Sequence, residues 1–355
     1  MSGGSDVTRG GVEGARPGRD APTGGHGGRR RRGRRSRGEQ PVVPEAEFSS
    51  YYGKPVLNKP PWAALDIAGY LYLGGLAGGS SLLAAGGHAF GRPGLARVAK
   101  LGAAGAITVS LGALVHDLGR PARFVNMLRV FKPTSPMNMG SWLLAGYAPL
   151  TMAAAATDVA GRHRLVGAAA TAGAALLGPA VATYTAVLLS DTAVPSWHEG
   201  YRELPFVFAG SAACAAAGLA LLGAPPGQTG PARRLAVLGA ALELGAFRVM
   251  ERRMGLAAEP FARGRAHRLL RAAEVLTAGG AGLAAYAGAD RRCGRGADRR
   301  CGRGAALVAG ATLLAGSAAL RFAVFHAGVA SAEDPRYTVV PQRERLRERS
   351  GRLDG

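Results

Sequence analysis

The chain has 355 residues, of which 48% are hydrophobic and 19% charged, and its formal net charge is +21. Three cysteines are too few for a disulfide scaffold or for a protein-held iron–sulfur cluster, which needs four thiolates. The charges gather in residues 1–61 and near the C-terminus, whereas residues 62–325 are mostly Ala, Gly, Leu and Val. This middle shows no alternation of helix and strand patterns, which argues against two ordinary soluble domains.

Residues 1–47 form a basic N-terminal segment with an arginine run at 29–35. It contains no apolar block, so the composition argues against a secretory signal peptide and against a folded domain. We therefore predict a disordered basic arm that holds the N-terminus on the cytoplasmic side of a membrane. Binding of anionic lipid or nucleic acid is the alternative, although we expect no nucleic-acid partner.

Residues 48–330 contain eight apolar runs separated by short Gly-, Pro- and Arg-containing joints. Each is close to the roughly 20 residues that a bilayer-spanning helix needs, and a backbone in lipid must satisfy its own hydrogen bonds. We predict an all-α integral membrane protein, a bundle of about eight transmembrane helices surrounded by membrane lipid. The runs are 63–88, 96–116, 141–160, 165–189, 204–224, 234–250, 269–288 and 305–326.

Glycines are abundant inside the first run, where residues 73–79 read LGGLAGG. A phosphate-binding loop is the rival interpretation, but no strand precedes the glycines and no Gly-Lys-Ser/Thr follows them. Small residues let membrane helices approach closely, so the pattern favours tight helix packing.

The C-terminal end of the chain combines a duplicated loop with a polar tail. Residues 288–295 read GADRRCGR and residues 296–303 repeat this sequence, so the spacing of Cys293 and Cys301 follows from copying. We therefore predict no metal site. Residues 331–355 are predicted to be a polar, basic tail.

An even number of spans places both termini on the same side. The termini and the joints on their side contain more Lys and Arg than the joints on the opposite side, and positively charged segments favour the cytoplasm. The predicted location is the plasma membrane, with multiple passes and cytoplasmic termini.

Ionisable residues near or within the apolar runs are functional candidates because they are costly in lipid. Asp66 begins the first run, and His116 and Asp117 close the second. Histidines that ligate a haem usually lie deeper in the hydrocarbon than His116 and His326, which end their runs, so we expect no haem.

Later runs carry a second set of charges. Glu243, Arg248 and Glu274 would line the path of an ion- or proton-translocating transporter, which is the alternative function. Structural ion pairs are the simpler interpretation, namely Glu243 with Arg248 in the interior and Arg271 with Glu274 on a helix surface.

Tyr184 lies near the middle of the fourth run. It is either a core tyrosine with a satisfied hydroxyl or a hydrogen-bond donor to a quinone carbonyl.

The joint after the second run reads DLGRPARFVNML at 117–128 and FKPTSPMNMGSW at 131–142. This string, with YYGKPV at 51–56 and the glycines at 73–79, resembles the polysulfide reductase membrane-subunit family, NrfD. The resemblance covers about residues 48–337.

The resemblance implies an eight-helix subunit that binds menaquinone or another quinone and carries neither haem nor an iron–sulfur cluster of its own. Its implied partners are an iron–sulfur, ferredoxin-like subunit and a molybdopterin catalytic subunit. Such a chain passes electrons between the quinone pool and the partner's clusters, and the complex's substrate chemistry belongs to another polypeptide.

The resemblance also assigns site residues. Tyr184 matches the family's helix-four tyrosine, Asp66 lies near the family's polar quinone contacts, and His116 and Asp117 could handle protons. Family partners commonly dock outside the cytoplasm at the start of the first helix, whereas the charge pattern places that side inside, so both orientations stay open. The loop residues Arg120, Arg123, Asn126 and Lys132 either dock the partner or stabilise the loop.

Overall fold

The computed structural model describes residues 6–8, 11–13, 56–57, 60, 62–117, 126–289 and 298–353. The chain forms two units, residues 1–47 and 48–355. Within the first unit, strands β1 (Asp6–Thr8) and β2 (Gly11–Glu13) pair antiparallel, with Val7 opposite Val12. The sequence predicted no regular structure there, but β-branched residues favour such pairing. The rest of the predicted arm lies outside the described residues.

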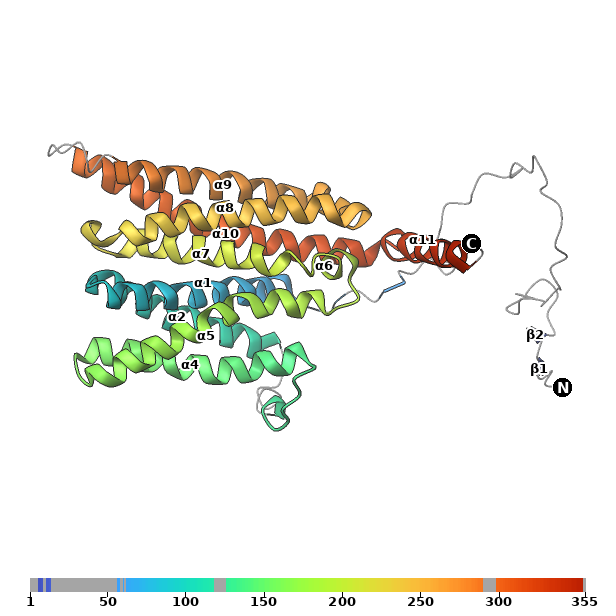
Figure 1. Ribbon diagram of the computed structural model, residues 1–355, viewed down its shortest axis with the longest axis horizontal. Coiled ribbons are helices and arrows are strands. Elements are labelled where there is room, and N and C mark those ends of the chain that lie inside the picture. Colours follow the sequence, from blue (N-terminus) through green and yellow to red (C-terminus); the bar gives the residue numbers. More distant parts are fainter. Residues whose placement is uncertain are drawn as a thin grey trace. The chain divides into compact units, whose positions relative to one another are not determined.

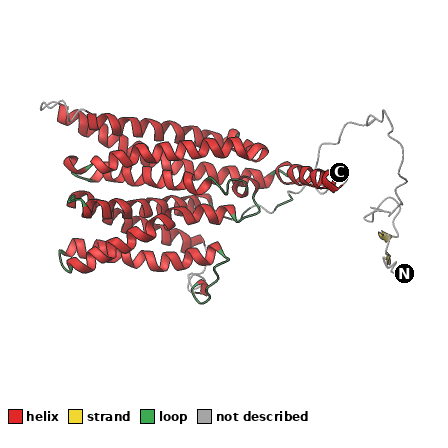
Figure 2. Cartoon of the chain, in the orientation of Figure 1, coloured by secondary structure: helices red, strands yellow, loops and turns green. Residues whose placement is uncertain are grey.

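The second unit is helical (Figures 1 and 2). Each of the eight predicted apolar runs is a helix, generally extended by a few residues at its ends. The long helices are α1 (Ala64–Ala89), α2 (Pro93–Asp117), α4 (Pro136–Ala160), α5 (Arg164–Ser190), α7 (Leu204–Gly223), α8 (Gly230–Met254), α9 (Gly264–Ala289) and α10 (Asp298–Glu333).

Four shorter or peripheral helices are also described in this unit. They are α6 (Pro195–His198), η1 (Pro226–Gln228), η2 (Gly255–Ala262) and α11 (Arg336–Leu353). The polar C-terminal tail is therefore largely helical. Of the duplicated loop, residues 290–297 lie outside the described part, and the second copy runs into α10.

Among the described residues, six helices are long and apolar enough to cross a membrane, namely α1, α2, α4, α5, α7 and residues 302–333 of α10. The prediction of a helical membrane bundle is confirmed, but the count of about eight spans is supported for six. Helices α8 and α9 are long enough to span but carry more charged residues, such as Arg234, Glu243 and Arg248 on α8.

The long helices form two groups of four. The first group contains α1, α2, α4 and α5, and the second contains α7, α8, α9 and α10. The two groups meet where α1 of the first lies beside α7 of the second (Figure 1). A Cβ at Gly78 would meet the carbonyl oxygen of Gly178 on α5, and one at Gly79 would meet that of Ala212 on α7. The glycines of α1 therefore serve tight helix packing, as predicted.

We call the end of the bundle where α1 begins the proximal end. Helices α2, α5, α8 and α10 end there, and α4, α7 and α9 begin there. Of the connecting segments that the structure describes, 126–135, 191–203 and 255–263 consequently share this end.

Candidate functional site

An apolar pocket lies at the proximal end of the first helix group. Its volume is about 100 Å³, and α1, α2, α4 and α5 all contribute to its wall. Four polar side chains, Tyr70, Asp117, Ser141 and Tyr184, interrupt the apolar lining, and Met127 and Met137 form part of the wall. The remaining wall includes Ile67, Leu71, Leu114, Leu144, Leu188 and Leu189.

Tyr184 on α5 is packed tightly into this wall. Its ring lies edge-on to Tyr70, with centroids 6.4 Å apart, and faces Gly140, where a Cβ would come within 2.5 Å of Tyr184 Cε2. The Tyr184 hydroxyl oxygen is buried and has no hydrogen-bond partner among the described residues. Because an unmade hydrogen bond at a buried hydroxyl is unfavourable, this group fits an acceptor supplied by a ligand.

The other three predicted quinone contacts gather beside the pocket. Asp117 lines it and accepts a hydrogen bond from the backbone of Ala63. His116 Nδ1 lies 3.0 Å from Asp66 Oδ2, and the His116 side chain is 79% exposed. Asp117 also interacts electrostatically with Asp66 and His116. The three groups thus extend from the apolar pocket to the exposed surface, an arrangement suited to proton exchange.

The loop before α4 is held by Asn138, a residue that the sequence did not single out. Asn138 Nδ2 donates to the carbonyl oxygens of Met127 and Val130 at 2.7 and 2.8 Å, and Asn138 Oδ1 accepts the Lys132 N–H at 2.7 Å. These bonds place Met127 at the pocket. Asn126 and the side chain of Lys132 are exposed.

Two of the predicted docking residues, Arg120 and Arg123, lie outside the described residues. The structure therefore places only half of the predicted docking set.

Trp62 and Trp197 link the pocket to the second helix group. Trp62 lines the pocket and stacks on Trp197, with ring centroids 5.8 Å apart. Trp197 is fully buried, and its Nε1 donates to the carbonyl oxygen of Val324 on α10 at 2.8 Å. A Cβ at Gly328 would collide with this indole, so α10 has a glycine where the ring packs.

Two of the three predicted proton-path residues, Arg248 and Glu274, lie together near the helix surface, whereas Glu243 lies apart from them. Glu274 pairs with Arg271 at 2.8 Å and with Arg248 at 3.6 Å, and both arginines are more than half exposed. The surface pairing of Arg271 with Glu274 is confirmed. The pairing of Glu243 with Arg248 is wrong, because residues five apart on a helix differ by about 140° in direction.

Glu243 instead points into the second helix group. Its side chain is 1% exposed, and its Oε1 accepts a hydrogen bond from Thr277 on α9 at 2.9 Å. Glu243 is therefore enclosed by protein, whereas the ion pairs of Glu274 involve exposed arginines.

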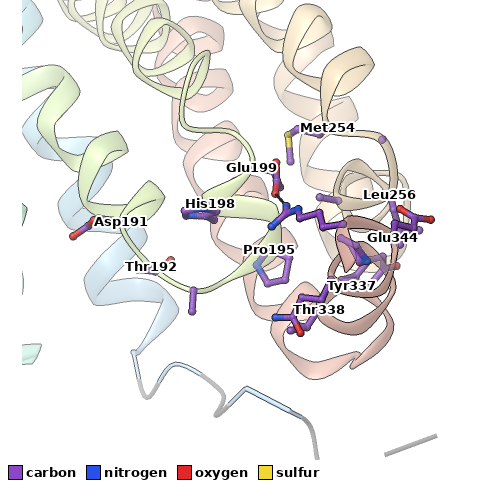
Figure 3. Close-up of a pocket in the computed structure, with 16 residues that line it drawn as sticks. Asp191, Thr192, Pro195, His198, Glu199, Met254, Leu256, Tyr337, Thr338 and Glu344 are labelled. Atoms are coloured by element: carbon purple, nitrogen blue, oxygen red, sulfur yellow. Dashed lines mark hydrogen bonds and ion pairs between the residues drawn. The ribbon is translucent and has the colours of Figure 1, made fainter. Parts of the chain in front are cut away.

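A larger and more open cleft, of about 660 Å³, lies at the proximal end (Figure 3). The 191–199 segment, the start of η2 and α11 line it, and an ion pair of 2.7 Å between Arg345 and Glu199 lies within it. None of the predicted quinone contacts lines this cleft. The apolar pocket is therefore the better candidate site.

Comparison with known families identifies the same part of the chain. Residues 56–238 match the family described as Polysulphide reductase, NrfD, which is just over half of the sequence. The chain belongs to the NrfD family. No curated protein matches it.

The NrfD match covers all residues that line the apolar pocket, together with the Asp66–His116 pair. Glu243 and the helices α9 and α10 lie beyond it. Membership of NrfD and six apolar helices identify a multi-pass membrane protein, which fits a membrane-anchor role in an oxidoreductase complex.

Proposed function

We propose that this chain is the quinone-interacting membrane anchor of a multi-subunit respiratory oxidoreductase, passing electrons between the quinone pool and an iron–sulfur partner. The observation that carries the proposal is Tyr184, which lines an apolar pocket with a carboxylate in its wall and whose buried hydroxyl has no partner among the described residues. Quinone sites need these features, because the ring is flat and apolar whereas its carbonyl oxygens need donors and a proton route.

Each polar residue has a distinct role in this proposal. A bound menaquinone or other quinone supplies the two-electron, two-proton chemistry. Tyr184 donates a hydrogen bond to a carbonyl oxygen and fixes the ring position. Asp117, at the pocket wall, and the Asp66–His116 pair, nearer the surface, hold protons and exchange them with solvent.

The apolar wall favours the ring but leaves little free space. A cavity of about 100 Å³ requires its lining to move when a quinone head group enters. Met127 and Met137 are the most adaptable wall residues, because an unbranched thioether side chain adjusts its shape readily.

Electrons must leave the pocket through another polypeptide, since three cysteines cannot hold a cluster. We assign this step to a ferredoxin-like iron–sulfur subunit that itself serves a molybdopterin catalytic subunit. The proximal loop with Arg120, Arg123, Asn126 and Lys132 is the proposed docking segment, because it begins directly after Asp117.

Helices α8 and α9 complete an eight-span bundle in this proposal. Their outward faces carry exposed apolar side chains, including Val237, Leu238 and Leu242 on α8 and Val275 on α9. Arginines flank the apolar stretch of α8 at positions 234 and 248, where long side chains reach the membrane surface. We propose that the proximal end and both termini face the cytoplasm, because Lys and Arg are numerous in the connecting segments at that end and positive charge favours the cytoplasmic side.

The test is steady-state quinol oxidation or quinone reduction by the purified complex. Tyr184→Phe removes one hydrogen bond, worth about 1.4 kcal/mol in binding the ligand, and we expect a fall of about tenfold in kcat/KM. Tyr72→Phe, on α1 but outside the pocket, is the matched control and should retain activity. Unchanged kinetics in both Tyr184→Phe and Asp66→Asn would remove the site assignment.

Transport of ions or protons without a partner is the alternative function. Flux through liposomes that contain only this chain would favour transport, whereas co-purification with an iron–sulfur subunit favours the anchor.

A further inference from the structure

Two opposite charges are buried within the second helix group, on helices that do not line the quinone pocket. Glu243 on α8 is 1% exposed and Arg321 on α10 is fully buried. The two interact electrostatically across the group. Ionisable side chains inside a membrane bundle are rare because their desolvation is costly, and they generally mark a function.

The hydrogen bonds of this pair are incomplete. Arg321 Nη2 donates to the carbonyl oxygen of Phe208 at 2.9 Å, and the guanidinium lies over the Phe208 ring, 3.6 Å from its centroid. Arg321 Nε and Nη1 have no partner among the described residues, and neither does Glu243 Oε2. Thr277 occupies only the other carboxylate oxygen, Oε1.

These unpartnered atoms are complementary in their hydrogen-bonding capacity. Two N–H donors of Arg321 and one acceptor oxygen of Glu243 match a water molecule, which accepts from the guanidinium and donates to the carboxylate. The backbone also leaves room for the charge, because a Cβ at Gly75 on α1 would lie 3.0 Å from Arg321 Nη2. Without water, three ionic atoms would be buried unsatisfied, which is strongly destabilising.

We propose that Glu243 and Arg321 form a water-containing proton-binding site inside the bundle, in addition to the quinone pocket. A proton adds to Glu243 Oε2 and converts the carboxylate to a neutral carboxylic acid, while the arginine stays charged and no electrons move. Proton release restores the neutral ion pair.

The neighbouring elements contribute few other titratable groups. Helix α7 contributes the Cys214 thiol, which interacts with the Glu243 charge, and the Ser211 hydroxyl, which faces the Glu243 carboxylate and lies 2.8 Å from Ser317 Oγ. Helix α9 contributes the Thr277 hydroxyl, and α1 contributes glycine backbone. Titration at this site therefore belongs to Glu243.

This inference retains one of the three residues of the predicted proton path, Glu243. Arg248 and Glu274 form their own pair with partly exposed side chains, so Glu243 is the member of the predicted set that lies inside the bundle. The inference does not depend on quinone binding, since the site shares no residue with the pocket.

The experiment is pH-difference infrared spectroscopy of the full chain, purified and reconstituted in lipid. All protonated Asp and Glu side chains absorb in the same region, so the diagnostic band is the component typical of a carboxyl group shielded from solvent, which we expect to grow as the pH falls and to shift in deuterium oxide. Glu243→Gln should abolish this band, and Glu274→Gln, the matched control on the neighbouring helix, should retain it.

A second variant keeps the test valid if Glu243→Gln fails to fold. Thr277→Val removes a hydrogen bond to the ionised carboxylate and should move the midpoint of the band upward by about one pH unit. The proposal is overturned if Glu243→Gln retains the band, if Glu274→Gln also loses it, or if the midpoint in Thr277→Val is unchanged. Quinol turnover, measured separately, tests only the quinone proposal.

Discussion

At the scale of single residues, Gly140 determines where the Tyr184 ring can lie. Gly140 is on α4, Tyr184 is on α5, and the aromatic ring occupies the space that a Cβ on Gly140 would fill. The same side chain lines the pocket, and its buried hydroxyl has no hydrogen-bond partner among the described residues. A small residue on one helix thus sets the position of a hydrogen-bond donor on another.

Gly140→Ala should therefore displace Tyr184 and impair quinone chemistry. We expect kcat/KM for quinol to fall about tenfold, because a displaced donor forfeits about 1.4 kcal/mol of hydrogen bonding. Steady-state kinetics of the purified complex measures this. Gly146→Ala is the control on the same helix, because its new Cβ would lie 3.7 Å from Leu177 Cδ1, an ordinary contact. Equal losses in both variants would contradict the proposed role of Gly140.

The sequence indicated some of these residues and missed others, for a physical reason. Asp66, His116 and Asp117 were recognised because charges at the ends of apolar runs are conspicuous, and the structure brings them together. Asn138 and the link between Gly140 and Tyr184 were missed, because their contacts join segments that only the folded chain brings together.

At the scale of elements, helix prediction worked where length and apolar composition sufficed. The sequence predicted all eight long helices. It did not predict that Glu243 points inward or that it interacts with Arg321, which is 78 positions further along the chain. A charge within an apolar run signals burial, but helical periodicity alone does not name its partner on another helix. The same charges lower the mean hydropathy of α8, so composition alone does not mark it as a span.

The proximal ends of α7 and α8 are joined by a charged clamp. Arg253, at the end of α8, donates to Glu203 Oε1 and Oε2 at 2.7 and 2.6 Å and also to the backbone carbonyl of Glu199. The hydrogen bonds from Arg253 hold the pKa of Glu203 below its usual value. The clamp therefore stabilises the fold above the unfolded-state pKa of about 4.3 and is lost as pH falls through the lower folded-state value.

Glu203→Gln should lower the melting temperature at pH 7 by roughly 2–4 °C, the shift that corresponds to about 1 kcal/mol. Near pH 3 the variant and the original chain should converge, because the original carboxylate is then increasingly protonated. Thermal unfolding in one detergent at both pH values measures this. The exposed Glu344→Gln change is the control, and a difference that grows toward low pH would refute the clamp.

At the scale of the whole molecule, the proposed quinone site and the proposed proton-binding site lie in different helix groups. The first group and α7 lie within the NrfD match and include the quinone pocket, whereas most of the second group lies beyond it and encloses the buried ion pair. In the proposed eight-span bundle α8 crosses the membrane, which would place the buried Glu243 at membrane depth.

Cysteine labelling tests both the crossing and its direction. In a variant without the three native cysteines, Gly227→Cys and Ala262→Cys flank α8 at its two ends. We expect an impermeant maleimide to label position 227 in intact cells and position 262 only after the cytoplasmic side is opened. Leu238→Cys, on the outward apolar face, should resist labelling. Labels on one side would mean that α8 does not cross, and a reversed pattern would place the proximal end outside the cytoplasm.

The stacked indoles of Trp62 and Trp197 provide an intrinsic optical reporter for this molecule. One ring borders the apolar pocket and the other is enclosed against α10, so their emission senses both helix groups. The sequence has only one further tryptophan, Trp142, which is 40% exposed. A Trp142→Phe background would leave the stacked pair as the only indoles, and fluorescence could then follow pocket occupancy without any added dye.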